Sequence, residues 1–91
     1  MISIVIPTFN EVENIVPLLK NLGFIIKDFE YEIIVVDDDS PDGTSEEVNK
    51  FMNLNKRIKL ITRIGRSGLS SAIKEGLIFA QGTYFLSLIH I

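Results

Sequence analysis

The sequence predicts an α/β fold in which a parallel sheet of about four strands is covered by helices on both faces. Short, unbroken apolar runs recur along the chain, as expected of strands that are buried on both faces. Segments with apolar residues at helical spacing separate these runs. No glycine- or proline-rich linker divides the 91 residues. The chain is therefore one domain or part of one.

The first unit is a strand followed by a helix. The run from Ile2 to Ile6 is mostly β-branched and ends at Pro7, which predicts a buried strand. Asn10 and Glu13 are spaced as in a capping box, so we expect Asn10 to be the helix N-cap. Gly23 either ends this helix or lies inside it. The apolar residues at helical spacing are Val12, Ile15, Val16, Leu19 and Leu22.

The second unit repeats the first. Ile33 to Val36 is an apolar run that predicts a strand, and a cluster of turn-forming residues from Asp37 to Gly43 follows it. Thr44 and Glu47 have the spacing of a capping box. The sequence therefore predicts a helix that begins near Thr44, with its apolar face formed by Val48, Phe51 and Met52.

The remaining chain predicts a strand, a helix and a last strand. Ile58 to Ile61 is a third apolar run, and a loop through Gly65 leads to a predicted helix from Leu69 to Gln81. Tyr84 to Leu88 predicts the fourth strand.

Composition excludes several classes of protein. The hydrophobic fraction of 46% is too high for a disordered chain, and the absence of cysteine excludes a disulfide framework and a thiolate zinc site. The net charge of −3 and the lack of a basic stripe with interleaved aromatic residues argue against a nucleic-acid partner. Charge is also uneven: residues 1–47 carry eleven acids and two lysines, whereas residues 48–91 carry seven basic residues and one acid. The two halves either attract each other as solvated faces or build a site that needs both signs, as a nucleotide diphosphate does.

Parallel sheets bind ligands beyond the carboxyl ends of their strands. Three predicted loops lie there, spanning Pro7–Glu11, Asp37–Thr44 and Arg63–Gly68. The adjacent acids at 37–39 repel one another, so we expect a ligand, a cation or backbone donors to compensate them. Phe9 either anchors its loop by packing or stacks on a planar base.

Three other kinds of site match these loops less well. Asp38, Ser40, Asp42 and Gly43 match the start of an EF-hand, but Asn49 stands where the bidentate glutamate is needed. Neither phosphate-binding glycine motif is present. A receiver-like module with an acidic pocket stays an alternative, although such domains use a later aspartate and none follows Asp42.

Three motifs in order resemble those of family 2 glycosyltransferases, and most of all the dolichyl (polyprenyl) phosphate mannose synthases. The first is Pro7-Thr8-Phe9-Asn10-Glu11. The second is Asp37-Asp38-Asp39-Ser40-Pro41-Asp42-Gly43-Thr44. The third comprises Arg63, Gly68, Leu69, Ala72 and Gly76.

The resemblance implies a Rossmann-like GT-A nucleotide-binding half and transfer of a hexose, such as mannose from GDP-mannose, to a polyprenyl phosphate at the cytosolic face of a membrane. It also implies roles for particular residues. Pro7, Phe9 and Glu11 would contact the nucleotide base and its surroundings, and Val36 and Asp38 would hold the base or ribose. Arg63 and Arg66 are candidate phosphate contacts on the basis of their charge and loop position.

The resemblance is incomplete at the end of the chain. After its fourth strand the family has Asp-x-Asp, which holds Mg2+ or Mn2+, whereas residues 87–91 here read Ser-Leu-Ile-His-Ile. We therefore expect residues 1–91 to be the N-terminal nucleotide-sugar-binding part of a GT-A domain, truncated at its C-terminus. We expect that part to bind nucleotide without holding the metal and without turnover.

Overall fold

The computed structural model describes residues 1–66 and 68–87 and has the predicted alternation of strands and helices. In chain order the elements are β1 (Ile2–Thr8), α1 (Ile15–Ile25), β2 (Tyr31–Asp37), α2 (Thr44–Met52), β3 (Ile58–Thr62), α3 (Leu69–Phe79) and β4 (Tyr84–Ser87). Leu88, which was predicted to end the last strand, lies outside the described residues.

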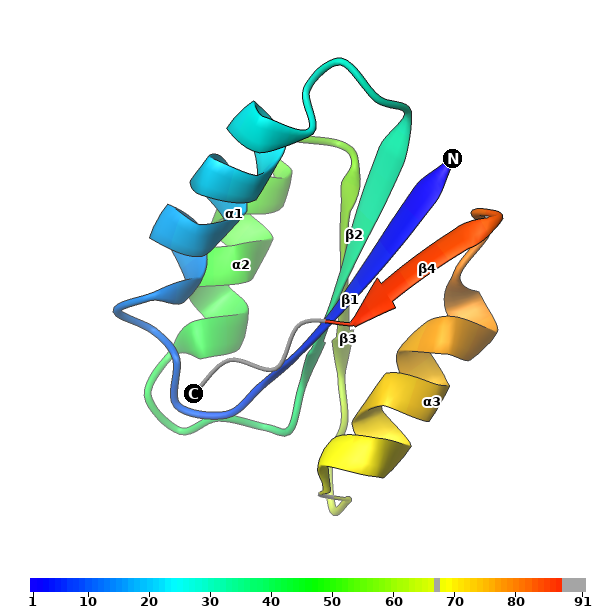
Figure 1. Ribbon diagram of the computed structural model, residues 1–91. Coiled ribbons are helices and arrows are strands. Elements are labelled where there is room, and N and C mark those ends of the chain that lie inside the picture. The colour runs from blue at the N-terminus through cyan, green and yellow to red at the C-terminus, as the bar shows by residue number, and fades with distance from the viewer. Residues whose placement is uncertain (67, 88–91) are drawn as a thin grey trace.

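The four strands form one parallel sheet in the order β3-β2-β1-β4. Helices α1 and α2 cover one face of the sheet and α3 covers the other (Figure 1). The predicted fold class is confirmed. This arrangement brings the ends of β1, β2 and β3 and their following loops to the same edge of the sheet, where residues from all three predicted loops can meet.

The core consists of two layers because strand side chains alternate between the two faces. Ile4, Ile6 and Val35 pack with α1 and α2, and Val5 and Val36 pack with α3. These strand residues are almost completely inaccessible to solvent. The unbroken apolar runs in the sequence are therefore explained by burial on both faces.

Two helix starts differ from the prediction. Asn10 is not an N-cap: it has a φ of 55°, and α1 begins five residues later, at Ile15. Thr44 and Glu47 do not form a capping box, since Gly43 precedes the helix with a φ of 93° and Thr44 is already its first residue. In both cases tertiary hydrogen bonds, described below, use the groups that a local cap would have used. Gly23 is an interior residue of α1.

A buried carboxylate links the sheet to the connection between α3 and β4. Glu32 accepts hydrogen bonds from Lys59 Nζ at 2.6 Å, Ser3 Oγ at 2.6 Å and the Gln81 N–H at 2.6 Å. The Gly82 N–H in turn donates to Ser3 Oγ at 2.9 Å. Burial would raise the pKa of Glu32, but the hydrogen bonds from Lys59, Ser3 and the Gln81 N–H outweigh it and lower the pKa below its ordinary value.

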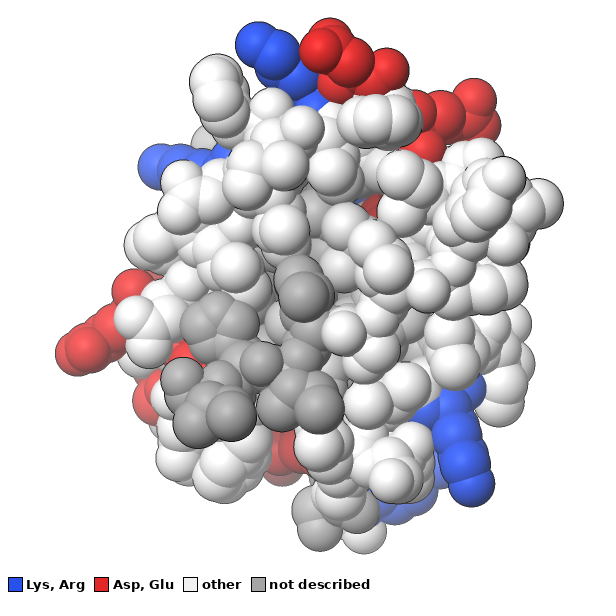
Figure 2. All heavy atoms as spheres, viewed as in Figure 1, with Lys and Arg blue, Asp and Glu red and all other residues white. Residues whose placement is uncertain are grey.

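Charged side chains are sparse on the side of the molecule seen in Figure 2, which is viewed as in Figure 1. Figure 2 shows Lys, Arg, Asp and Glu mainly round the margin of this view. Tyr84, Phe85 and Leu86 of β4 are each more than half exposed. None of the helices in the described ranges is long and apolar enough to cross a membrane.

We predict opposite effects of the same substitution at two helical glycines. A Cβ at Gly76 would lie 2.4 Å from Val5 Cγ1, inside the packed core. A Cβ at Gly23 would lie 3.4 Å from the Tyr31 hydroxyl oxygen, an ordinary contact. Gly76→Ala should lower the free energy of unfolding by about 1–2 kcal/mol, whereas Gly23→Ala should raise it by about 0.5–1 kcal/mol. Urea denaturation of both variants checks the two signs, and a stabilising Gly76→Ala would contradict the close packing of α3.

We also predict a pH-dependent contribution from Glu32. Because its pKa is lowered in the folded protein, its carboxylate stabilises the fold above its ordinary value of 4.5. That stabilisation is lost as the pH falls below this value. Glu32→Gln should lower the free energy of unfolding at pH 7 by about 1–3 kcal/mol, and the difference from the wild type should narrow below pH 4.5. Denaturation between pH 3 and pH 7 measures this, with the exposed Glu13→Gln as the matched control; a difference independent of pH would contradict it.

Candidate functional site

A pocket of about 380 Å³ lies at the carboxyl ends of β1 and β2, against the start of α3. Its volume is in the range of small-molecule sites. All three loops singled out in the sequence analysis contribute to its wall. The lining residues are Pro7, Thr8, Phe9, Glu11, Asp38, Gly68 and Leu69.

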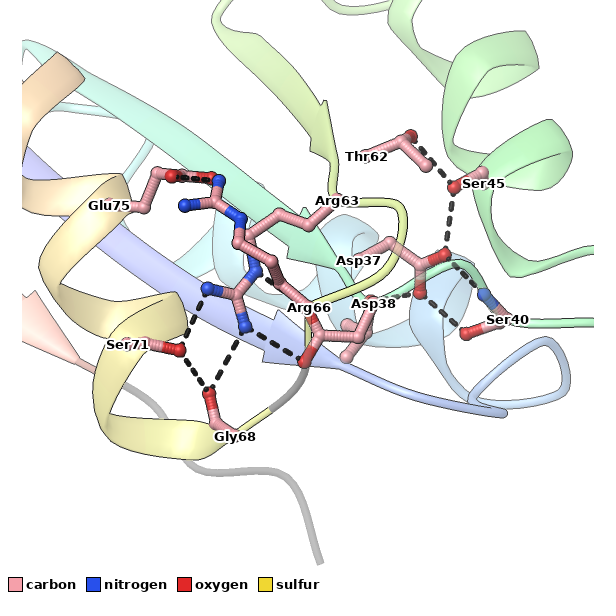
Figure 3. A network of polar contacts seen from close by, with 11 residues as sticks. Asp37, Asp38, Ser40, Ser45, Thr62, Arg63, Arg66, Gly68, Ser71 and Glu75 are labelled. Atoms are coloured by element: carbon pink, nitrogen blue, oxygen red, sulfur yellow. Dashed lines mark hydrogen bonds and ion pairs between the residues drawn. The ribbon is translucent and has the colours of Figure 1, made fainter.

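Asp37, the last residue of β2, is a fully buried structural carboxylate next to Asp38 of the pocket lining. It accepts hydrogen bonds from Thr8 Oγ1 at 2.7 Å, the Ser40 N–H at 3.0 Å, Ser40 Oγ at 2.6 Å and Ser45 Oγ at 2.8 Å. Figure 3 shows the Ser40 and Ser45 side chains turned toward it. These donors provide the compensation expected for the crowded acids, and they fix the loop between β2 and α2 to the end of β1.

The loop after β1 is held by side chains of the loop after β2 and the start of α2. Three consecutive N–H groups donate across the gap: Asn10 to Ser40 Oγ at 2.9 Å, Glu11 to Thr44 Oγ1 at 3.0 Å and Val12 to Asp42 Oδ2 at 3.2 Å. The backbone that carries Phe9 and Glu11 is therefore set by a second segment about 30 residues away.

Asp42 and Thr44 reinforce each other within that second segment. Asp42 Oδ1 accepts from Thr44 Oγ1 at 2.5 Å and from the Thr44 N–H at 3.1 Å, so it forms the turn that the sequence predicted for it. The hydrogen bond from the Thr44 hydroxyl, together with those from the Val12 and Thr44 N–H groups, lowers the pKa of Asp42. The Thr44 hydroxyl thus donates to Asp42 and accepts from Glu11.

Asp38 forms a two-pronged ion pair with Arg63. Arg63 Nε lies 2.7 Å from Asp38 Oδ1 and Nη2 lies 3.0 Å from Oδ2. The Arg63 side chain is almost wholly buried, at 1% exposed. The hydrogen bond from its guanidinium to Asp38 raises the pKa of Arg63 above its ordinary value.

The structure brings four of the predicted site residues together. Pro7, Phe9, Glu11 and Asp38 all line the pocket, and the Phe9 side chain is 56% exposed. The exposure of the Phe9 ring favours contact with a ligand over the alternative of a packed loop anchor. The contacts with base and ribose stay predictions.

The other three predicted residues lie outside the pocket lining. Val36 is buried in the core under α3. Arg63 faces Asp38, and Arg66 pairs with Glu75 of α3 (Figure 3). The roles predicted for these residues in holding base, ribose or phosphate likewise stay predictions.

Sequence reasoning assigned no site role to several residues that build the site. Asp37, Ser40 and Thr44 act through hydrogen bonds inside the protein, and Leu69 lines the pocket from the first turn of α3. The alternation of Ser40, Asp42 and Thr44, every second residue of the loop, was a usable signal, because it places three polar side chains opposite three backbone N–H groups.

The residues described by the structure do not form a metal site. Within them, no group of three or more His, Asp or Glu side chains is placed to hold a metal ion. Asp37 accepts hydrogen bonds from three hydroxyl groups and one N–H group, and Asp38 is paired with Arg63. The stretch in which the family's Asp-x-Asp would fall runs into residues 88–91, which lie outside the described part of the chain.

The chain is similar to curated enzymes from archaea and fungi. It is 40% identical over 85 residues to a dolichol-phosphate mannosyltransferase of Pyrococcus furiosus, with 93% of this chain and 24% of the relative covered. It is 36% identical over 89 residues to the dolichol-phosphate mannosyltransferase of Saccharomyces cerevisiae, with 94% of this chain and 33% of the relative covered. The chain thus spans about a quarter to a third of the length of these relatives.

Solved structures share the fold. The crystal structure of S. aureus TarS superposes with a TM-score of 0.81 at 30% identity, covering 97% of this chain and 16% of TarS. The mannosyltransferase PcManGT from Pyrobaculum calidifontis, solved in complex with GDP-Man and Mn2+, superposes with a TM-score of 0.63 at 25% identity and covers 88% of this chain and 24% of PcManGT. The four-stranded parallel sheet with its helices is the Rossmann-like sheet of the GT-A fold.

The family model described as glycosyl transferase family 2 matches residues 3–88, which include every pocket residue and all of the helices and strands described above except Ile2, the first residue of β1. This match and the relatives confirm the resemblance seen in the three motifs. The chain belongs to glycosyl transferase family 2.

Proposed function

We propose that this chain is the part of a polyprenyl-phosphate mannosyltransferase that binds the nucleotide sugar. In this proposal the complete protein transfers mannose from GDP-mannose to dolichyl or another polyprenyl phosphate at the cytosolic face of a membrane. The observation that carries it is the pocket, in which an exposed aromatic ring and two acidic residues converge from the loops after β1 and β2.

The pocket has the chemistry that a nucleoside needs. The Phe9 ring is an exposed flat surface on which a base can stack. Glu11 and Asp38 supply carboxylate oxygens, which accept hydrogen bonds from the N–H groups of a base or the hydroxyls of a ribose. Such an arrangement orients a donor without reacting with it.

The relatives support the nature of donor and acceptor. The curated relatives from three organisms are all named dolichol-phosphate mannosyltransferase. PcManGT, which shares the fold, was crystallised with GDP-Man and Mn2+. The same family membership favours transfer over the receiver-like binding module that the acidic loop alone left open.

The proposed reaction depends mainly on the positioning of donor and acceptor. A lipid phosphate is already anionic, so it needs little help from a general base to attack the anomeric carbon with inversion. In the complete protein Mg2+ or Mn2+ would neutralise the leaving diphosphate. In this proposal the role of the described residues is to bind the nucleotide and to hold it in orientation.

We predict that the 91-residue chain binds GDP and that Phe9 stacks on the base. Phe9→Ala should weaken binding by about 5- to 150-fold, because stacking on an aromatic ring contributes about 1–3 kcal/mol. Isothermal titration calorimetry with GDP, UDP and acetyl phosphate measures this.

Phe79→Ala is the matched control, since Phe79 is 57% exposed and lies at the far end of α3. It should bind GDP as the wild type does. A wild-type chain that binds acetyl phosphate and no nucleotide would support the receiver-like alternative. GDP affinity unchanged by Phe9→Ala would remove the proposed base site.

We also predict that binding depends on the hydrogen bond between the two loops at Thr44. Thr44→Val keeps the buried shape but leaves the Glu11 N–H without its acceptor, so the loop carrying Phe9 should move. GDP affinity should fall by about fivefold to tenfold. The exposed Thr83→Val is the control. Wild-type affinity in Thr44→Val would show that the position of this loop does not govern binding.

A further inference from the structure

Arg63 follows β3, and its side chain contacts both the residue after β2 and the start of α3. Its Nε and Nη2 atoms hold the carboxylate of Asp38, which follows β2. Its Nη1 donates to Ser71 Oγ at 2.8 Å, and its Nη2 also donates to the Gly68 carbonyl oxygen at 3.2 Å. Figure 3 shows the guanidinium between Asp38 on one side and Gly68 with Ser71 on the other.

The backbone around this guanidinium is fixed as well. The Arg63 N–H donates to the Asp37 carbonyl oxygen at 2.8 Å, and the Asp38 N–H donates to the Thr8 carbonyl oxygen at 3.1 Å. Gly68 has a φ of 119°, a conformation that favours glycine, and its carbonyl oxygen also accepts from the Ser71 hydroxyl. Arg63 therefore links the start of α3, at Gly68 and Ser71, to Asp38 directly after β2.

Arg63 contacts residues of the pocket lining but does not itself line the cavity. Asp38 and Gly68 line the cavity, whereas Arg63 does not and is 1% exposed. Four hydrogen bonds from its guanidinium go to protein acceptors. This position is unlike that of an arginine that receives the phosphate of a ligand.

We propose that Arg63 is a positioning residue for the nucleotide: its planar fork sets the Asp38 carboxylate and the Gly68 carbonyl at a fixed separation across the pocket. This inference rests on the proposed function. A lysine would keep the charge at this place but has neither the plane nor the number of donors that the arrangement uses. The positioning role therefore predicts that charge alone is not sufficient.

Arg57 provides a matched comparison at the opposite end of β3. It lies directly before this strand, is exposed, and donates from Nη1 to the Phe29 carbonyl oxygen at 3.3 Å. Arg57→Lys therefore makes the same chemical change at an arginine that does not contact the residues of the pocket lining.

The test compares Arg63→Lys with Arg57→Lys in the 91-residue chain by calorimetric titration with GDP, at a temperature well below the unfolding transition of each variant. Arg63→Lys should weaken binding about tenfold or more, as the loss of a two-pronged charged contact to Asp38 implies. Arg57→Lys should change GDP affinity by less than about twofold, as expected of an exposed arginine outside the pocket. A folded Arg63→Lys that binds GDP as tightly as the wild type would overturn the inference and leave the proposed function standing.

A second measurement needs no variant and covers the case in which Arg63→Lys does not fold. In 15N-labelled wild-type protein, the Nε–H signal of Arg63 should shift on addition of GDP, because the nucleotide contacts the carboxylate to which that N–H donates. The Nε–H signal of Arg57, at the amino end of β3, should stay in place. GDP binding that leaves the Arg63 signal unmoved would overturn the positioning role alone, whereas a wild type that binds no GDP would overturn the proposed function and this inference with it.

Discussion

The site depends on one set of hydrogen bonds, in which the loop after β2 and the start of α2 hold the loop after β1. Ser40, Asp42 and Thr44 each accept one of three consecutive backbone N–H groups. Without them these N–H groups would have no regular partner, since the chain there is neither strand nor helix. Asp37 links the loop after β2 to β1, because its carboxylate accepts hydrogen bonds from both Ser40 and Thr8. An exposed aromatic ring can face solvent at a defined place only because the backbone beneath it is fixed in this way.

The fold could be predicted from the sequence because burial on both faces leaves a strong signal. Strands between two helix layers must be apolar at every position, and the runs at Ile4–Ile6 and Ile33–Val36 are. The helix starts could not be predicted from local pattern. Asn10 and Thr44 have the side chains of helix caps, but a partner some 30 residues distant competes for the same hydrogen bonds.

The location of the site could be predicted, whereas the division of labour within it could not. Topology places the carboxyl ends of parallel strands together, so the motifs that follow Ile6, Val36 and Thr62 had to meet. Asp37, Asp38 and Asp39 are chemically identical in the sequence, yet the strand pleat turns successive side chains in opposite directions. Asp37 is therefore buried against hydroxyls, Asp38 faces Arg63, and Asp39 has a φ of 52° and is exposed.

Part of the uneven charge of the sequence is used in ion pairs between neighbouring strands. Glu32 pairs with Lys59 and Asp38 with Arg63, and each pair joins β2 or the residue after it to β3 or the residue after it. The first lies at the amino end of the sheet and supports the connection between α3 and β4, so it is structural. The second lies at the carboxyl end and includes a carboxylate of the pocket wall. The same pairing of β2 with β3 thus stabilises the sheet at one end and shapes the candidate site at the other, which couples the position of Asp38 to the register of the two strands.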